Sequence, residues 1–353
     1  MKKKKITGII IVVLLFFLLL MVVQQLFMPK YMSGVYEGRL VGEYYTERKS
    51  HDVLFIGDCE VYENFSPMAL WEHYGITSYI RGSPQQLIWQ SYYLLEETLN
   101  YETPKVVVFS VLSMMYNEPQ NEAYNRLTLD GMWVSKSKYS SVSASMTEGE
   151  QMITYVFPIL RYHDRWRELS GEDFRYFFSG RKVSHNGYMM RCDIKPVTFV
   201  PTGPKLPDYT FGSTSYEYLD KITALCKEND IELVLIKSPS LYPYWYDEWD
   251  GQIADYARAN ELKYVNTLDM LDEIGIDWDT DTYNGGLHLN VFGAEKTSVF
   301  LGAYLRTSFD LADHRSDEKI SRIWDKKIIA YYAMKESQMQ EFEEYGSVKT
   351  LTY

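Results

Sequence analysis

The chain has 353 residues, of which 46% are hydrophobic, enough to bury the core of a folded domain with insertions. Its formal net charge of −12 argues against nucleic acid or another polyanion as the main ligand. Three cysteines do not make a disulfide framework, and no Cys and His spacing matches a zinc site.

The first predicted element is an apolar helix close to the N-terminus. Residues 6–23 carry no charge and follow lysines at positions 2–5. About 20 such residues cross a bilayer core of about 30 Å. A cleaved signal peptide is the alternative, but its apolar region is shorter, about 7–15 residues, and ends in small residues. We expect residues 1–27 to be a single-pass anchor of the cell membrane, with the lysines cytoplasmic and the C-terminal domain extracellular.

Strand and helix patterns alternate after a polar, Tyr-rich segment at residues 28–50, which predicts a stalk with one short helix. The predicted strands are 53–56, 77–80, 105–111, 231–237 and 263–266. The predicted helices are 67–74, 86–99, 216–229, 251–260 and 291–306. This alternation predicts an α/β fold with a doubly wound, flavodoxin-like parallel sheet and right-handed crossovers.

Two segments fall outside this alternation. Residues 118–210 predict an insertion of helices and loops, covering or flanking the rim at the carboxyl ends of the strands, within a domain at 51–310. Residues 311–353 predict a C-terminal amphipathic helix and tail, for which packing against the domain is favoured over a partner or membrane role.

Several loops follow predicted strand ends and predict a shared rim. They are residues 57–59, Gly82, 112–117 and 238–242. In doubly wound sheets, ligands bind beyond the carboxyl ends of the strands. We expect the candidate site at this rim.

Cys59 and His288 are the candidate catalytic pair. Cys59 follows the first strand, and His288 lies in a Gly-rich loop at 284–290. A nucleophile at a strand end with a late histidine is typical of hydrolases and acyltransferases. The alternative is that Cys59 is a small residue in a degenerate site, because the charges of Asp58 and Glu60 disfavour a thiolate. Asp58 is better explained as a helix N-cap than as an acid–base group.

Three ordered blocks resemble the SGNH/GDSL hydrolase superfamily: Gly57-Asp58-Cys59, Gly82, and His288 before the last helix of the domain. The resemblance implies an SGNH hydrolase-like fold, with Cys59 in place of the nucleophilic serine and His288 as base. It also implies an oxyanion hole formed by the backbone N–H groups of Gly82 and Cys59. The whole chain is similar to the membrane-anchored cell-surface branch that includes teichoic acid D-alanyl transfer and alginate O-acetyltransferase proteins.

The chain departs from the family pattern beside the histidine and at the third block. Gly285 stands where the family has an aspartate three residues before the histidine, which leaves Asp281 as the best candidate orienting acid, with Asn284 nearby. Asn117 is the nearest counterpart of the third-block asparagine. An alternating series of aspartates that includes Asp281 resembles a calcium loop, but Thr282 occupies the position that requires glycine. We therefore expect no metal and no cofactor.

Five further residues are candidates for substrate binding: Asp58, Glu60, Asn117, Tyr242 and Trp245. Glu60 could instead hold His288. The aromatic segment 241–249 fits a shelf for sugars or acyl chains and fits a hydrophobic plug equally well.

Two hypotheses for function follow. In the first, the protein is an extracytoplasmic esterase or O-acyltransferase that acts on cell-wall or exopolysaccharide esters through Cys59 and His288. In the second, it is a catalytically degenerate glycan-binding or scaffold subunit, because a fold does not guarantee its usual chemistry. The expected partners are a cell-surface glycan or acylated small molecule and a multi-span membrane O-acyltransferase.

Overall fold

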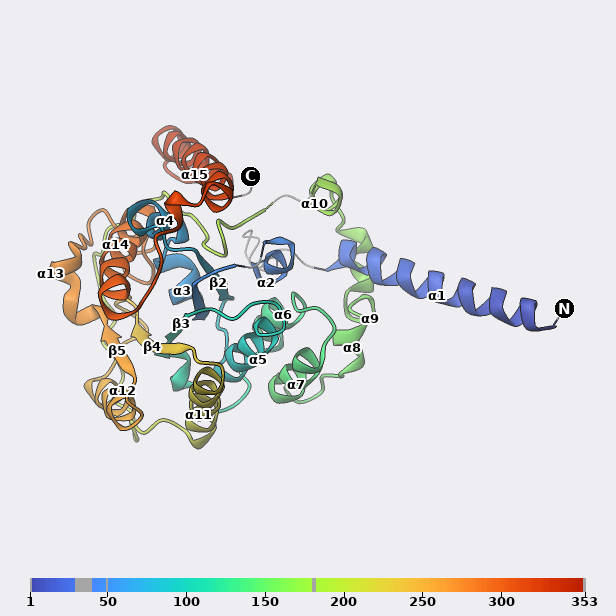
Figure 1. Ribbon diagram of the computed structural model, residues 1–353, viewed down its shortest axis with the longest axis horizontal. Helices are drawn as coiled ribbons and strands as arrows, with labels where there is room; N and C mark the ends of the chain where they lie inside the picture. Colours follow the sequence, from blue (N-terminus) through green and yellow to red (C-terminus); the bar gives the residue numbers. More distant parts are fainter. Residues whose placement is uncertain (1, 29–39, 49, 180–181, 352–353) are drawn as a thin grey trace.

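A five-stranded parallel sheet in the order β2-β1-β3-β4-β5 forms the centre of the protein (Figure 1). The computed structural model describes residues 2–28, 40–48, 50–179 and 182–351. The strands are β1 (Val53–Gly57), β2 (Ser78–Gly82), β3 (Val106–Ser110), β4 (Glu232–Lys237) and β5 (Lys263–Asn266). The predicted flavodoxin-like parallel sheet is confirmed, and its order reverses between β1 and β3, where ligands bind in such sheets.

Both faces of the sheet are covered, which explains the continuous apolar runs of its strands. Along β1, Leu54 and Ile56 belong to one hydrophobic core, and Val53 and Phe55 belong to the other. Successive side chains of a strand point to opposite faces, so each strand contributes to both cores.

The first face carries α3, α4, α14 and α15 (Figure 1). Their bounds are α3 (Cys59–Asn64), α4 (Pro67–Tyr74), α14 (Val291–Ser308) and α15 (Glu318–Tyr345). The C-terminal helix α15 packs on α4, where the rings of Trp71 and Trp324 stack with centroids 5.1 Å apart. Packing against the domain therefore accounts for the apolar stripe of α15.

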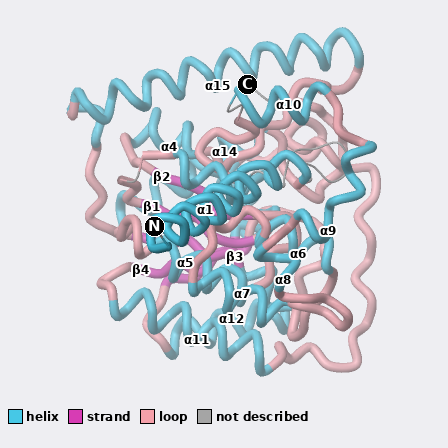
Figure 2. Tube along the Cα trace, turned by 90° about the vertical axis from the view of Figure 1, so that its right-hand side faces the viewer, coloured by secondary structure: helices cyan, strands magenta, loops and turns pink. Residues whose placement is uncertain are grey.

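The second face carries α5, α7, α11 and α12 (Figure 2). Their bounds are α5 (Ile88–Thr98), α7 (Lys136–Ser145), α11 (Ser213–Glu228) and α12 (Asp247–Ala259). Short elements complete the domain: η3 (Val111–Met115), η5 (Thr267–Met270), α13 (Leu271–Ile274) and η6 (His314–Ser316).

The predicted stalk at residues 28–50 lies largely outside the described residues. Its described part forms α2 (Leu40–Glu43) and η2 (Tyr44–Thr46). Val41 and Tyr44 are buried in the core beside α5. Residues 40–46 therefore belong to the domain rather than to a stalk, because their apolar side chains complete its core.

The insertion contains α6 (Glu122–Leu129), α8 (Ile153–Val156), α9 (Ile159–Tyr162), η4 (His163–Arg167) and α10 (Gly171–Ser179). The chain then runs without a helix or strand from residue 182 to residue 212. This loop covers the edge of β2, where the Ile80 N–H donates to the Asn186 carbonyl at 2.9 Å. It continues to the start of α14, where the Val291 N–H donates to the Arg191 carbonyl at 2.8 Å.

The N-terminal helix α1 (Lys2–Phe27) extends away from the sheet (Figure 1). Its segment Lys4–Phe27 is long and apolar enough to cross a membrane, and its large apolar side chains from Ile6 to Leu19 are exposed. The helical conformation suits such an environment, because it satisfies its own backbone hydrogen bonds.

Candidate active site

Cys59 lies at the turn that joins β1 to α3. Gly57 ends β1 with a φ of +152°, and a Cβ atom there would lie 2.7 Å from the Cβ of Ser110 on β3. Only glycine fits this position. Asp58 then caps α3, because its Oδ1 accepts a hydrogen bond from the Glu60 N–H at 3.1 Å. Cys59, the first residue of the helix, is partly exposed.

His288 lies in a loop that is held closed by its own side chains. The His288 N–H donates to Oδ1 of Asn284 at 2.8 Å, and the Asn284 amide nitrogen lies 2.8 Å from Nδ1 of the ring. The Thr282 hydroxyl donates to the His288 carbonyl at 2.8 Å. The loop therefore holds the ring, and Asn284 contacts both the backbone N–H and Nδ1 of His288.

The carboxylate beside His288 belongs to Glu63 on α3. Oε2 of Glu63 lies 2.9 Å from Nδ1 of His288 and also accepts a hydrogen bond of 2.5 Å from the Tyr283 hydroxyl. His288 is 7% exposed, and its Nε2 has no hydrogen-bond partner among the described residues. Nδ1 faces both an acceptor, the carboxylate of Glu63, and a donor, the Asn284 amide nitrogen. In the tautomer that donates from Nδ1 to Glu63, Nε2 keeps a lone pair. This is the arrangement of an oriented general base.

Cys59 and Glu63 are four residues apart in α3. Residues at this spacing lie on one helix face, with Cβ atoms about 5–6 Å apart. Glu63, the partner of His288, therefore lies on the helix face that carries Cys59. The electrostatics agree, because the charge of Glu63 acts on both the thiol and the imidazole.

The thiol of Cys59 is neutral at ordinary pH. Burial raises its pKa well above the usual value, and the carboxylates of Asp58, Glu63 and Glu60 raise it further. Burial alone would lower the pKa of His288, but the same carboxylates outweigh burial, and the pKa of His288 is raised. Both shifts follow from one cluster of negative charge. The site therefore favours a proton on sulfur at rest and favours the imidazole as its acceptor.

Asp58 shares the burial and the negative surroundings of Cys59. Burial, reinforced by the nearby charge of Glu60, raises the pKa of Asp58 to about 7. The carboxyl is 3% exposed. Its Oδ1 accepts the capping hydrogen bond of α3 and is also approached by the Ser110 hydroxyl, at 3.5 Å.

Glu60, a predicted substrate-binding residue, lies beneath the site instead. It is 1% exposed, and its Oε1 lies 2.5 Å from Nζ of Lys237 at the end of β4. The side chain of Lys237 is fully buried and also donates to the Ser238 carbonyl at 2.7 Å. The ion pair joins α3 to β4, so Glu60 neither meets a substrate nor holds His288.

Asn64 connects α3 to two loops of the rim. Its amide nitrogen donates to the hydroxyls of Ser238 at 2.8 Å and Ser240 at 3.1 Å. Its Oδ1 accepts the Leu289 N–H at 2.8 Å. Asn64 is completely buried, so these bonds fix the histidine loop relative to α3.

Asp281, predicted as the orienting acid, lies in another network. Its Oδ2 accepts hydrogen bonds from Nζ of Lys296 at 2.6 Å and from the Asp277 N–H at 2.8 Å. It thereby joins its loop to α14, and the contact with His288 belongs to Glu63. Asn117 is also directed elsewhere, because its Oδ1 accepts the Thr214 N–H at 2.9 Å at the start of α11.

The remaining predicted residues have structural explanations as well. A Cβ at Gly82 would lie 3.0 Å from Cγ2 of Val61, so this glycine lets β2 pack closely on α3 beside Gly57. Trp245 is 8% exposed and packs among Phe211 and other rings, which fits a hydrophobic plug. The Tyr242 hydroxyl donates to the Asn284 carbonyl at 2.9 Å and supports the histidine loop.

Sequence reasoning missed Glu63, Lys237 and Asn64. Glu63 had a usable signal, because its spacing of four from Cys59 places both on one face of any helix that starts at the turn. Lys237 ends a predicted strand, where an amine beside apolar residues signals a buried ion pair. Nothing in the local pattern distinguishes Asn64 from a polar surface residue.

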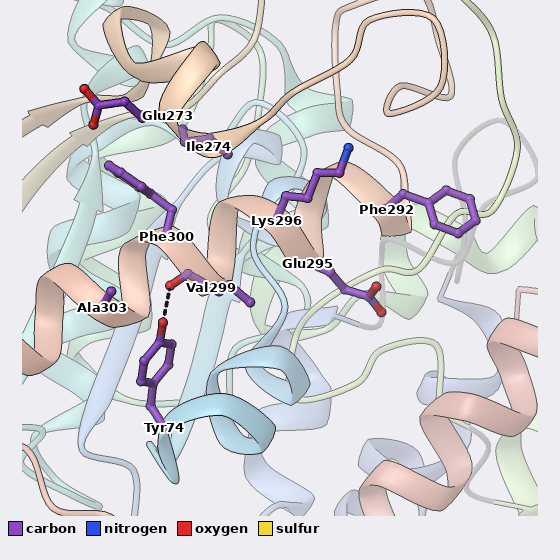
Figure 3. Close-up of a pocket in the computed structure, with 9 residues that line it drawn as sticks. All are labelled: Tyr74, Glu273, Ile274, Phe292, Glu295, Lys296, Val299, Phe300 and Ala303. Atoms are coloured by element: carbon purple, nitrogen blue, oxygen red, sulfur yellow. Dashed lines mark hydrogen bonds between the residues drawn. The ribbon is translucent and has the colours of Figure 1, made fainter.

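A separate groove of about 490 Å³ lies on the outer side of α14 (Figure 3). Its lining includes Phe292, Phe300 and Tyr74, whose hydroxyl donates to the Val299 carbonyl at 2.8 Å. Neither Cys59 nor His288 lines it. The groove is therefore distinct from the candidate site. Within the described part of the chain, no group of three or more His, Cys, Asp or Glu residues could hold a metal ion.

No family model and no curated protein matches the chain. Among solved structures, the chain is similar to a "putative lipolytic protein of G-D-S-L family" from Desulfitobacterium hafniense. The sequence identity is 13% and the TM-score is 0.36, over 72% of this chain and 99% of that chain. Similarity at this level carries no conclusion about the reaction, which depends on the residues of the site.

Proposed function

We propose that the protein is a membrane-anchored SGNH-like esterase or O-acyltransferase in which Cys59 is the nucleophile, His288 is the base and Glu63 orients the base. The observation that carries the proposal is the state of His288. One ring nitrogen is bound by the buried carboxylate of Glu63, which lies on the same helix face as Cys59, and the other is buried and unpartnered among the described residues.

The reaction would proceed by general-base catalysis with a neutral thiol. Nε2 of His288 takes the thiol proton as the sulfur of Cys59 attacks the ester carbonyl, which forms a C–S bond. The ester C–O bond then breaks, and the alcohol leaves with the proton from the imidazolium. A water molecule or an acceptor hydroxyl next attacks the thioester carbonyl and forms a C–O bond, while His288 accepts its proton. The C–S bond then breaks, and the imidazolium returns the proton to the sulfur of Cys59.

Stabilisation of the oxyanion would come from backbone N–H groups. Gly82 lies beside Gly57 at the carboxyl ends of the two strands, and the Cys59 N–H begins α3. Two N–H groups aimed at the developing charge are the usual device for acyl transfer. A thioester is also activated towards an acceptor hydroxyl, which supports transfer to a glycan as well as hydrolysis.

The proposed location is the outer face of the cell membrane. The length and apolar composition of α1 support a single span, and the lysines at its start support a cytoplasmic N-terminus. The proposed substrate is an ester on a cell-wall glycan or exopolysaccharide, supplied or shared by a multi-span membrane O-acyltransferase.

One observation favours a second candidate, a glycan-binding or scaffold subunit without catalysis. Burial and three carboxylates hold the pKa of Cys59 far above its usual value, which disfavours the reactive thiolate. In this candidate the rim binds a glycan, and the Glu63–His288 pair only fixes the loop.

An ester hydrolysis and transacetylation screen of the full chain in detergent separates the two candidates. Turnover of acetyl esters should be lost in Cys59→Ala and His288→Gln. Cys226→Ala is the matched control, because this buried cysteine lies on α11, on the other face of the sheet. Turnover that survives Cys59→Ala would remove the thiol from the mechanism, and binding of glycan without turnover would favour the scaffold.

A further inference from the structure

Large apolar side chains are exposed on the part of the insertion that lies beside α1. This segment, residues 153–179, contains α8, α9, η4 and α10 and is here named the collar (Figure 1). Its exposed apolar residues include Leu160 (52%), Trp166 (60%), Phe174 (45%) and Phe178 (79%). Apolar surface of this kind, gathered on one segment, indicates contact with another body.

The collar is hydrogen-bonded to the C-terminal end of α1. The Arg165 guanidinium donates to the Phe27 carbonyl at 2.7 Å and to Oδ1 of Asp173 at 3.2 Å. Asp173 is 4% exposed, so this arginine joins the last turn of α1 to α10 through a buried carboxylate. Farther along α1, the rings of Phe17 and Phe157 lie with centroids 6.5 Å apart.

The position of this ring contact sets the depth of the collar. Phe17 lies six residues before Val23, the last residue of the uncharged apolar run. At 1.5 Å per residue, Phe17 is about 9 Å inside the apolar run. Amphipathic helices at a membrane surface bury their apolar faces about 5–10 Å into the boundary between headgroups and acyl chains. If α1 spans the bilayer, Phe157 reaches this depth.

The exposed charges of the collar are of both signs, because Asp164 and Glu168 are exposed carboxylates and the exposed Arg161 pairs with Glu122 at 2.9 Å. The guanidinium of Arg167 lies 5.2 Å from the ring centroid of Trp166. Tryptophan and arginine together are typical of the headgroup level of a bilayer. There the ring and the alkyl stem are buried among lipids, and the guanidinium stays hydrated.

We propose that the collar docks on the phospholipid bilayer around the emerging end of α1 and holds the domain against the membrane surface. This inference rests on the membrane anchor in the proposed function and is independent of the reaction. Continuity with α1, the depth of Phe157 and the paired Arg167 and Trp166 all point to a lipid surface as the occupant.

Fluorescence of a label on the collar tests this docking. The protein tested is the full chain with Phe178→Cys in a Cys59→Ala background. It is labelled with nitrobenzoxadiazole, whose fluorescence depends on its environment. Cys192 and Cys226 are buried, so the label reports position 178 alone. The labelled protein is reconstituted into vesicles of phosphatidylcholine and phosphatidylglycerol, with or without lipids that carry a nitroxide near the headgroup. Ile329→Cys is the matched control, because Ile329 is 70% exposed on α15, which both views place away from α1 (Figures 1 and 2).

Docking predicts at least a twofold loss of fluorescence at position 178 with nitroxide lipids, and no loss at position 329. Equal signals at the two positions, in protein that floats with the vesicles after a carbonate wash, would overturn the docking and leave the anchor intact. A label at position 178 that is shielded from aqueous iodide but not quenched by the lipids would assign the surface to a second copy of the chain. Protein that fails to float would overturn both the anchor and the docking.

Discussion

Oε2 of Glu63 lies 2.9 Å from Nδ1 of His288 and joins the first helix after β1 to the loop before α14. The contact brings together two segments from opposite ends of the domain. It leaves Nε2 of the ring buried and without a hydrogen-bond partner among the described residues. The proposed reaction depends on this contact, because an imidazole that turns freely presents the wrong nitrogen much of the time.

Glu63→Gln should lower kcat/KM for an acetyl ester by up to about 10⁴-fold, because the amide no longer selects the productive tautomer. Glu63 also raises the pKa of His288. Its loss should therefore move the acidic limb of the pH–rate profile, where His288 becomes protonated, to lower pH. Asp281→Asn is the control, because Asp281 contacts Lys296 rather than His288. The same shift of the limb in both variants would contradict the orienting role of Glu63.

Cys59 should react slowly with iodoacetamide at pH 8, at least about tenfold more slowly than glutathione. The raised pKa of Cys59 leaves little thiolate at this pH, and alkylation requires the thiolate. Glu63→Gln should speed the reaction by removing one of the charges that oppose ionisation. Mass spectrometry of the alkylated peptide gives the rate. Alkylation as fast as that of glutathione would mean that the thiol is already activated.

Lys237→Met should destabilise the protein by about 3–5 kcal/mol, because Glu60 would remain as an unpaired buried charge. The double variant Glu60→Gln with Lys237→Met should recover much of this loss. Urea unfolding of the full chain in detergent, followed by tryptophan fluorescence, measures the difference. No recovery in the double variant would show that Lys237 contributes through its packing rather than its charge.

Glu43 should make the stability depend on pH. Burial raises its pKa from 4.5 to about 7, although the Ser184 hydroxyl and the Val183 N–H donate to it. Between these values the folded state holds a proton that the unfolded state releases. The free energy of unfolding should therefore fall as pH rises from about 4.5 to 7, by up to about 1.4 kcal/mol per pH unit for this group.

Glu43→Gln should flatten this dependence, since the amide does not titrate. Unfolding in urea at pH 5 and at pH 7.5 provides the comparison with the unaltered chain. Asp58, whose pKa is also raised to about 7, continues to titrate in the variant. An unchanged slope in Glu43→Gln would assign the whole effect to Asp58 and other groups.

The sheet was predictable from the sequence because its signal is local. In β1 and β4, the residues that belong to either hydrophobic core are all apolar. Segments with a helical pattern separate the strands in the sequence. The turn at Gly57 and Asp58 was equally readable, since a glycine and a capping residue act on their own neighbours. The length and composition of α1 required no tertiary information.

The partners of the charged side chains were decided only by the tertiary structure. Asp281 is closer to His288 in sequence than Glu63, yet Glu63 makes the contact, because α3 lies against the histidine loop and Asp281 turns towards Lys296. Glu60, one turn earlier on α3, is paired instead with Lys237 beneath the site. Local propensity sets where a helix begins, but only the packing of distant segments determines which carboxylate reaches which cation.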